Sequence, residues 1–151
     1  MAGSCDPSDH PYLKSDNHEI TGGPDPSFNC IAWAAGDPDR WWWPGPTGIT
    51  YWPKQSPRRE TADAFASAFR TLGYNVCDDG ALEQDFEKVA IFARNVRGVL
   101  IPTHAARQLE SGMWTSKMGA LEIISHSSPE DVSGPVYGSV VGYLSRRRNR
   151  R

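Results

Sequence analysis

The second half of the chain consists of short apolar runs separated by turn residues, and this pattern limits the folds that it can adopt. Each run has the length of a strand, and the runs begin after Gly73. The turn at 110–112, Glu-Ser-Gly, predicts a hairpin in which Leu109 pairs with Met113. The pattern therefore predicts an antiparallel sheet. Its strands are expected at 74–77, 88–93, 99–101 continuing into 103–109, 113–117, 121–124 and 136–144.

Two helices are expected before these strands. Asn29 is a good N-cap residue, and the small and apolar residues at 30–35 end at Gly36. A second helix is expected after Thr61, because apolar residues recur there at three- and four-residue spacing up to Leu72. The order of helices and then strands predicts an α+β fold, with the helices on one side of the sheet.

The length and composition predict one folded domain with irregular ends. The chain has 151 residues, 38% of them hydrophobic, and we expect a single domain over 28–144. Residues 1–27 are expected to form an irregular arm, and 145–151, with five arginines, a disordered basic tail. The formal net charge of -2 argues against a basic nucleic-acid-binding face. Contact with nucleic acid is therefore expected only through the tail.

The three cysteines include no CxxC pair, which favours a reducing compartment. No secretion signal is visible, and no stretch approaches the roughly 20 apolar residues of a membrane span. We therefore expect a cytoplasmic protein that makes no membrane contact. No HxxxH pair and no Gly-rich phosphate loop is present, so we expect no metal and no cofactor.

Cys30 is the strongest candidate for a nucleophile. A thiol at a helix N-terminus lies near the positive end of the helix dipole, which favours the thiolate. His104 is the preferred general base, since His10 and His18 lie in the arm and His126 in an expected surface turn. The alternative is that Cys30 is an inert, buried side chain.

Further residues could complete such a site. The hairpin register places Glu122 just beyond His104, where its carboxylate would orient the imidazole, with Ser116 as a rival. Asn29 could donate to an oxyanion or be used for capping. The aromatic side chains of Trp33, Trp42 and Trp43 could form the wall of a substrate groove, or could pack against the helices.

Four motifs resemble a poorly characterised, mainly bacterial domain family over roughly residues 26–144. They are NCIAWAAGD at 29–37, WWWP at 41–44, THAARQL at 103–109 and WTSK at 114–117. More remotely, a Cys on a helix followed by a His on a strand is similar to the NlpC-type and CHAP-type branches of the papain-like superfamily. That resemblance implies a papain-like α+β fold, with Cys30 attacking a carbonyl and His104 as base.

Two functions follow from these observations. The first is a cysteine hydrolase or acyltransferase that acts on an amide or ester bond, including a peptide, with Cys30, His104 and Glu122 as its triad. The second is a catalytically inactive binding module. It would use the tryptophan-rich loop at 41–52 as its contact surface and keep Cys30 only for packing.

Overall fold

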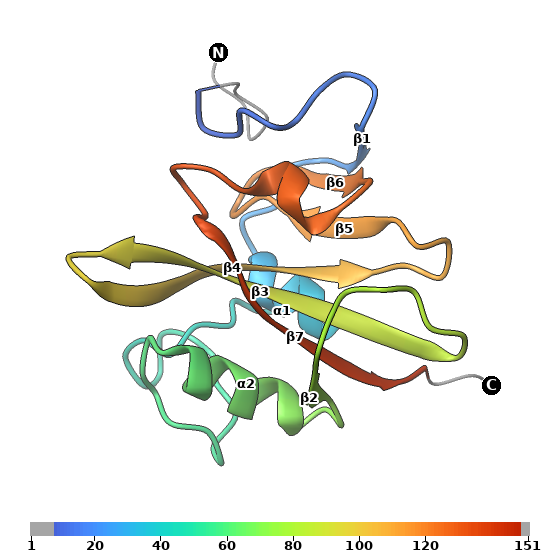
Figure 1. Ribbon diagram of the computed structural model, residues 1–151. Helices are drawn as coiled ribbons and strands as arrows, with labels where there is room; N and C mark the ends of the chain where they lie inside the picture. Colours follow the sequence, from blue (N-terminus) through green and yellow to red (C-terminus); the bar gives the residue numbers. More distant parts are fainter. Residues whose placement is uncertain (1–7, 149–151) are drawn as a thin grey trace.

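A computed structural model describes residues 8–148 of the chain. A seven-stranded sheet dominates it, in the order β1-β6-β5-β4-β3-β7-β2, and all neighbouring strands are antiparallel (Figure 1). The elements, in chain order, are β1 (His18–Gly22), α1 (Cys30–Ala35), α2 (Ala62–Arg70), β2 (Asn75–Cys77), β3 (Phe86–Val96), β4 (Val99–Gln108), β5 (Trp114–Lys117), β6 (Ile123–His126), the 3₁₀ turn η1 (Pro129–Val132) and β7 (Ser139–Arg147).

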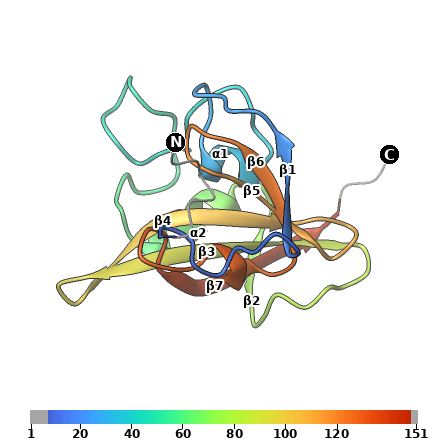
Figure 2. The ribbon, with the colours of Figure 1, turned by 90° about the horizontal axis from the view of Figure 1, so that it is seen from above.

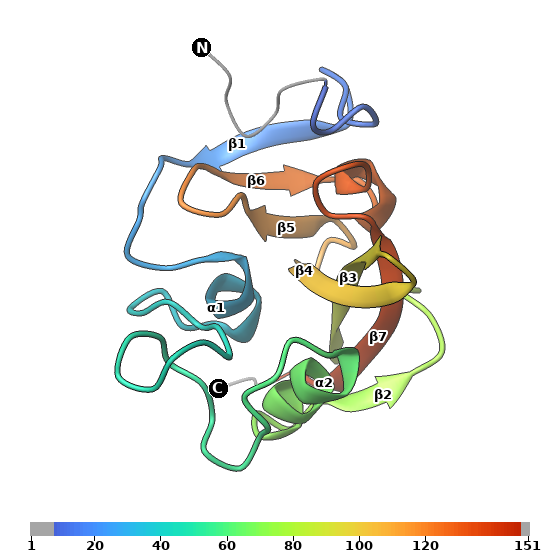
Figure 3. The same cartoon turned by 90° about the vertical axis from the view of Figure 1, so that its left-hand side faces the viewer.

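The sheet separates two apolar cores. The sheet curves around α1 and α2, which lie on the same side of it (Figure 3). Phe65 and Phe69 of α2 pack in the core on that side, together with Cys30 of α1. The second core lies on the other side, where Leu13 of the arm and Val132 of η1 cover the strands. We call these two sides the helix face and the loop face.

Both predicted helices are present and are capped as expected. The Oδ1 of Asn29 accepts a hydrogen bond from the N–H of Ala32, and Gly36 ends α1 with a φ of 83°. The Oγ1 of Thr61 accepts a hydrogen bond from the N–H of Ala64 at the start of α2. Local sequence therefore decided where both helices begin and where α1 ends, whereas α2 ends at Arg70, two residues before the expected end at Leu72.

The expected α+β papain-like fold is wrong. The helices contain only six and nine residues, whereas seven strands form the body of the molecule. Gly36 stops α1 after less than two turns, so it cannot form the longer helix that a papain-like core needs. The antiparallel sheet itself was correctly predicted.

The ends of the domain also differ from expectation. The expected arm contains β1, which pairs with β6, and the expected tail contains the end of β7. The Nε of Arg146 in β7 forms an ion pair of 3.0 Å with Glu87 of β3, which explains why this basic segment is ordered. Outside β1, the described part of the arm, 8–17 and 23–27, contains neither helix nor strand. The parts of the two predictions that fall on 1–7 and 149–151 lie outside the described residues.

β4 pairs with two neighbours over different lengths. It pairs with β3 from Val99 to Arg107, with a bulge at Thr103, but it pairs with β5 only at Arg107 and Gln108. Figure 2 shows α1 lying over β4, and α1 contacts both β4 and β5. The edge of β4 that faces away from β3 therefore has no strand partner at 99–106, and the side chain of Cys30 from α1 donates to one of its backbone oxygens, that of Thr103.

Candidate functional site

The sulfur of Cys30 lies against the open edge of β4. Its S–H donates to the backbone oxygen of Thr103 over 3.8 Å. Cys30 is 5% exposed, and burial raises the pKa of its thiol to about 11. Hydrogen bonds from nearby backbone N–H groups, the first from Ala105, favour the thiolate but do not offset this burial. The thiol is therefore protonated at neutral pH and is not activated.

His104 projects from the loop face of the sheet, whereas Cys30 packs on the helix face. Side chains alternate along a strand, and the next residue, Ala105, belongs to the same core as Cys30. The ring of His104 instead stacks on Tyr137, with 4.0 Å between centroids, and packs edge-on against Phe92. The structure does not bring Cys30 and His104 together.

His104 belongs instead to a chain of hydrogen bonds that joins three strands. Its Nε2 lies 3.0 Å from the Oγ of Ser116 on β5, and the same Oγ lies 2.8 Å from the Nε2 of His126 on β6. The Nδ1 of His126 lies 2.7 Å from the backbone oxygen of Ser128. All three side chains in this chain are fully buried.

The backbone oxygen of Ser128 sets the direction of these bonds. It can only accept, so Nδ1 of His126 carries the proton and Nε2 accepts from Ser116. The Oγ of Ser116 then accepts from Nε2–H of His104. The Nδ1 of His104 is left as a buried acceptor without a hydrogen-bond partner. Burial is the main cause that holds the pKa of His104 well below its usual value and lowers that of His126, so both rings are neutral at pH 7.

Glu122 does not orient His104. It lies in the turn between β5 and β6, where its backbone oxygen accepts from the N–H of Met118. Its carboxylate acts on Lys117, whose pKa it raises against the larger effect of burial. The rival that the sequence offered, Ser116, is the residue that contacts the imidazole.

The proposed substrate-binding residues mainly stabilise the fold. The Oδ1 of Asn29 caps α1 and also accepts from the N–H of Trp42, while its Nδ2 donates to the oxygen of Trp42 over 2.7 Å. Both ends of the Asn29 amide are therefore used to hold α1 and the following loop together, and the residue is 2% exposed. Trp42 is 3% exposed, and half-buried Trp33 and Trp43 pack against the same core. The packing alternative for these indoles is the one that the structure supports.

Lys117 is a buried residue that the sequence reasoning did not single out. Its Nζ donates to the backbone oxygens of Asp25, Phe28 and Gly119, over 2.6, 3.2 and 2.8 Å. Burial is the largest cause of the lowered pKa of this ammonium group. The available signal was that Lys117 ends the motif WTSK, which was predicted to be a strand. A lysine in a buried strand needs hydrogen-bond acceptors for its ammonium group.

Two classes of feature are absent from the part of the chain that the structure describes. Between residues 8 and 148, no three His, Cys, Asp or Glu side chains are grouped so that they could hold a metal ion. Within the same residues, no helix has the length and apolar character needed to cross a membrane.

Comparison with protein families gives one match. The model of a domain of unknown function, DUF7689, matches residues 19–145. The chain belongs to this family. A poorly characterised family was expected, whereas the match lends no support to the papain-like resemblance. The DUF7689 match begins in β1 and ends in β7, so it includes all seven strands of the sheet. Comparisons with curated proteins and with solved structures found no match.

Proposed function

We propose that this DUF7689 domain is a binding module and that Cys30 is a packing residue. The observation that carries the proposal is the placement of Cys30 and His104 on opposite faces of the sheet, each with other partners. A cysteine hydrolase needs the base within hydrogen-bond reach of the sulfur. The arrangement gives a neutral thiol beside a backbone oxygen instead.

The loop that follows α1 supports a binding function. Trp43 and Tyr51 are joined by a backbone hydrogen bond of 3.0 Å, and Arg58 donates to the backbone oxygens of Gly45 and Thr50. Ile49 is 77% exposed at the tip of this loop. The loop is thus held in one shape by its own polar contacts, and pre-ordering lowers the entropy lost when a partner binds. Because Trp42 and Trp52 are buried, the contact surface is the tip of the loop rather than its full set of indoles.

Thiol labelling tests the first part of the proposal. The folded protein is treated with iodoacetamide from pH 6 to 9, and each labelled cysteine is identified by mass spectrometry. We expect Cys77, which is partly exposed, to react, and Cys30 to react only after denaturation. Cys77 thus serves as an internal control for the reagent. Rapid labelling of Cys30 near neutral pH, lost in His104→Ala, would overturn the proposal and restore the hydrolase.

The loop tip can be tested separately. Ile49→Asp places a charge on the exposed tip and should leave folding unchanged, because the side chain contributes little buried area. We expect it to abolish capture of a partner that the wild-type domain retains. Val76→Asp, at another exposed apolar residue on β2, is the matched control. Equal loss in both variants would show that the loop is not the contact surface.

A further inference from the structure

The guanidinium group of Arg107 is partly buried on the helix face without a carboxylate partner. Within residues 8–148 it forms no ion pair, and its Nε is buried and makes no hydrogen bond. It lies 5.6 Å from the ring centroid of Trp33 on α1. Burial is the largest effect on the pKa of this group and lowers it, while Tyr74 and the carboxylate of Glu87 act in the opposite direction. A partly buried cation that forms no ion pair of its own is costly, so the arrangement requires a reason.

The hydroxyl group of Tyr74 is a second buried group without a partner. Tyr74 follows α2 and is 1% exposed, and its Oη makes no hydrogen bond. Burial and the negative charge of Glu87 raise the pKa of Tyr74 to about 12, while the positive charges of Arg146, Arg107 and Arg148 act in the opposite direction. The guanidinium of Arg146 lies 4.5 Å from the centroid of the Tyr74 ring. Arg146 pairs with Glu87 on β3, two residues from Val89, which pairs with Arg107.

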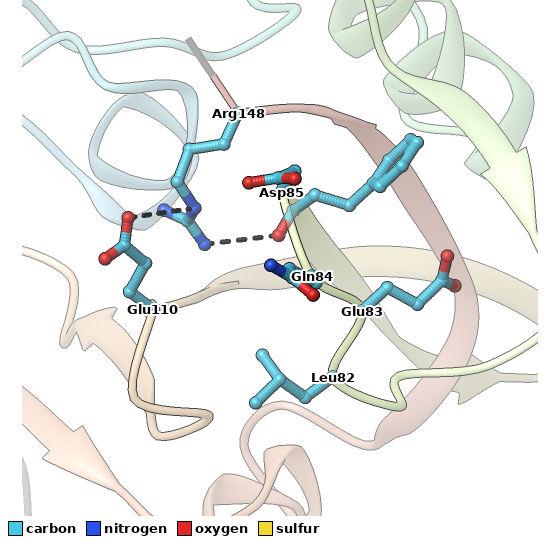
Figure 4. A pocket seen from close by; sticks show the side chains of 7 residues that line it. Leu82, Glu83, Gln84, Asp85, Glu110 and Arg148 are labelled. Carbon is cyan, nitrogen blue, oxygen red and sulfur yellow. Dashed lines mark hydrogen bonds and ion pairs between the residues drawn. The ribbon is translucent and has the colours of Figure 1, made fainter. Parts of the chain in front are cut away.

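The buried carboxylate near these groups, that of Glu87, already forms ion pairs with two arginines. The two oxygens of Glu87 lie 3.0 Å from Nε of Arg146 and 3.9 Å from Nη1 of Arg148. Arg146 also donates to the backbone oxygen of Leu72. Figure 4 shows that Arg148 turns toward Glu110. Its Nε lies 3.8 Å from a carboxylate oxygen of Glu110, and its Nη2 donates to the backbone oxygen of Phe86. Glu87 is therefore shared among the three arginines and is the one buried carboxylate of the described residues.

We propose that the group formed by Arg107, Tyr74, Arg146 and Arg148, here called the arginine cluster, binds an oxyanion carried by a ligand. An oxyanion placed between them would accept hydrogen bonds from both the guanidinium of Arg107 and the hydroxyl of Tyr74, whose Nε and Oη make no hydrogen bond in the protein. Three cations facing one buried carboxylate leave an excess of positive charge, which disfavours a cationic ligand. Trp33 provides a flat apolar wall beside Arg107 for the remainder of the ligand.

This inference rests on the proposed binding function and adds to it a second site, separate from the loop tip, whose ligand class is a carboxylate or a phosphate group. The two sources share the same chemistry, because both present oxygens that match the fork of an arginine. The experiment therefore includes one probe of each kind.

The test titrates the full chain with inorganic phosphate and with acetate, against chloride at equal ionic strength. Thermal unfolding and isothermal calorimetry are the two readouts. A ligand that binds the folded state raises Tm, so at least one oxyanion should raise it more than chloride does. Arg107→Gln should weaken binding roughly tenfold or more, because it removes charge-assisted hydrogen bonds. A response to phosphate alone assigns a phosphate group, and a response to acetate as well assigns a carboxylate.

Controls separate a site from general charge. Arg97→Gln removes the same charge at the far tip of the β3–β4 hairpin and should bind as the wild type does. Tyr74→Phe removes the unpartnered hydroxyl, so it should not lower stability without ligand but should weaken oxyanion binding. If Arg107→Gln does not fold, Arg107→Lys keeps the charge and removes the fork, and should still weaken binding.

Equal responses to chloride, or unchanged binding in the variants of Arg107 and Tyr74, would overturn the proposal. The labelling of Cys30 does not depend on these residues. If no oxyanion binds while Cys30 is unreactive, the arginine cluster is rejected as a binding site, but the proposal that the domain is a binding module is not.

Discussion

The Nε2 of His104 lies 3.0 Å from the Oγ of Ser116, and this contact joins β4 to β5 beyond the residues at which the two strands pair. Backbone hydrogen bonds do not hold the strands together there. A buried side-chain bond replaces them, and His126 extends it to β6. The histidine that the sequence offered as a general base is thus a structural connection between strands.

Replacing Ser116 should destabilise the domain. Ser116→Ala leaves the Nε2–H of His104 without an acceptor and the Nε2 of His126 without a donor. The cost of two buried unsatisfied groups is about 2–4 kcal/mol, measured as the free energy of unfolding in urea. Ser125→Ala, on the opposite face of β6, should change it by less than about 0.5 kcal/mol. Similar losses in both variants would mean that the hydrogen-bond chain adds no stability.

Stability should fall as the pH drops below about 6.5, the usual histidine value. Burial lowers the pKa of His104 and His126 in the folded state, so the unfolded chain binds more protons as the pH falls below the usual histidine value. Their stabilising effect is complete above that value and is lost toward lower pH, by up to about 1.4 kcal/mol per pH unit for each ring. Urea unfolding at several pH values measures this slope. His104→Gln keeps a donor for Ser116 but does not titrate, and an unchanged slope in this variant would contradict the assignment.

Asn29 should not tolerate aspartate, although aspartate is as good an N-cap in general. Asn29→Asp keeps the acceptor for α1 but sets a carboxylate oxygen against the backbone oxygen of Trp42, where the amide now donates over 2.7 Å. We expect a loss of at least about 2 kcal/mol in thermal or urea unfolding. Thr61→Ala removes a cap with a single side-chain bond at α2 and should cost only about 1 kcal/mol. A wild-type stability for Asn29→Asp would show that the bond to Trp42 is not needed.

Lys117 should be essential for the path of the chain into α1. Lys117→Met keeps most of the apolar volume but leaves the backbone oxygens of Asp25, Phe28 and Gly119 without this donor. We expect about 2–4 kcal/mol of destabilisation and faster hydrogen exchange at the start of α1. Lys54→Met, at an exposed position, is the control and should change stability little. Slow exchange in Lys117→Met would show that packing alone holds this segment.

Several local features were predictable because neighbouring residues decide them. Asn29 and Gly36 set the limits of α1, and Thr61 sets the start of α2. The hairpin register was also correct, since the N–H of Leu109 donates to the oxygen of Met113. The packing of Cys30 was available as the unreactive alternative. Its burial depends on contacts that no local pattern contains.

The separation of Cys30 and His104 shows where sequence reasoning ended. A strand places alternate residues on opposite faces, so an error of one position exchanges the two faces. The early end of the β4–β5 ladder, which leaves room for the thiol on one face and for the imidazole on the other, arises from seven strands packing together. Arg107, Tyr74 and Arg146 lie far apart in the sequence, and no sequence pattern around them predicted that they share one face of the sheet.

The sequence by itself determined the start of both helices, the end of α1, the main hairpin and the antiparallel character of the sheet, because caps, turns and periodicity act over a few residues. Only the tertiary structure decided the strand order, the face that each side chain occupies and the partners of Cys30 and His104. These depend on contacts between residues that are far apart in the chain, such as Cys30 with Thr103 and Lys117 with Asp25.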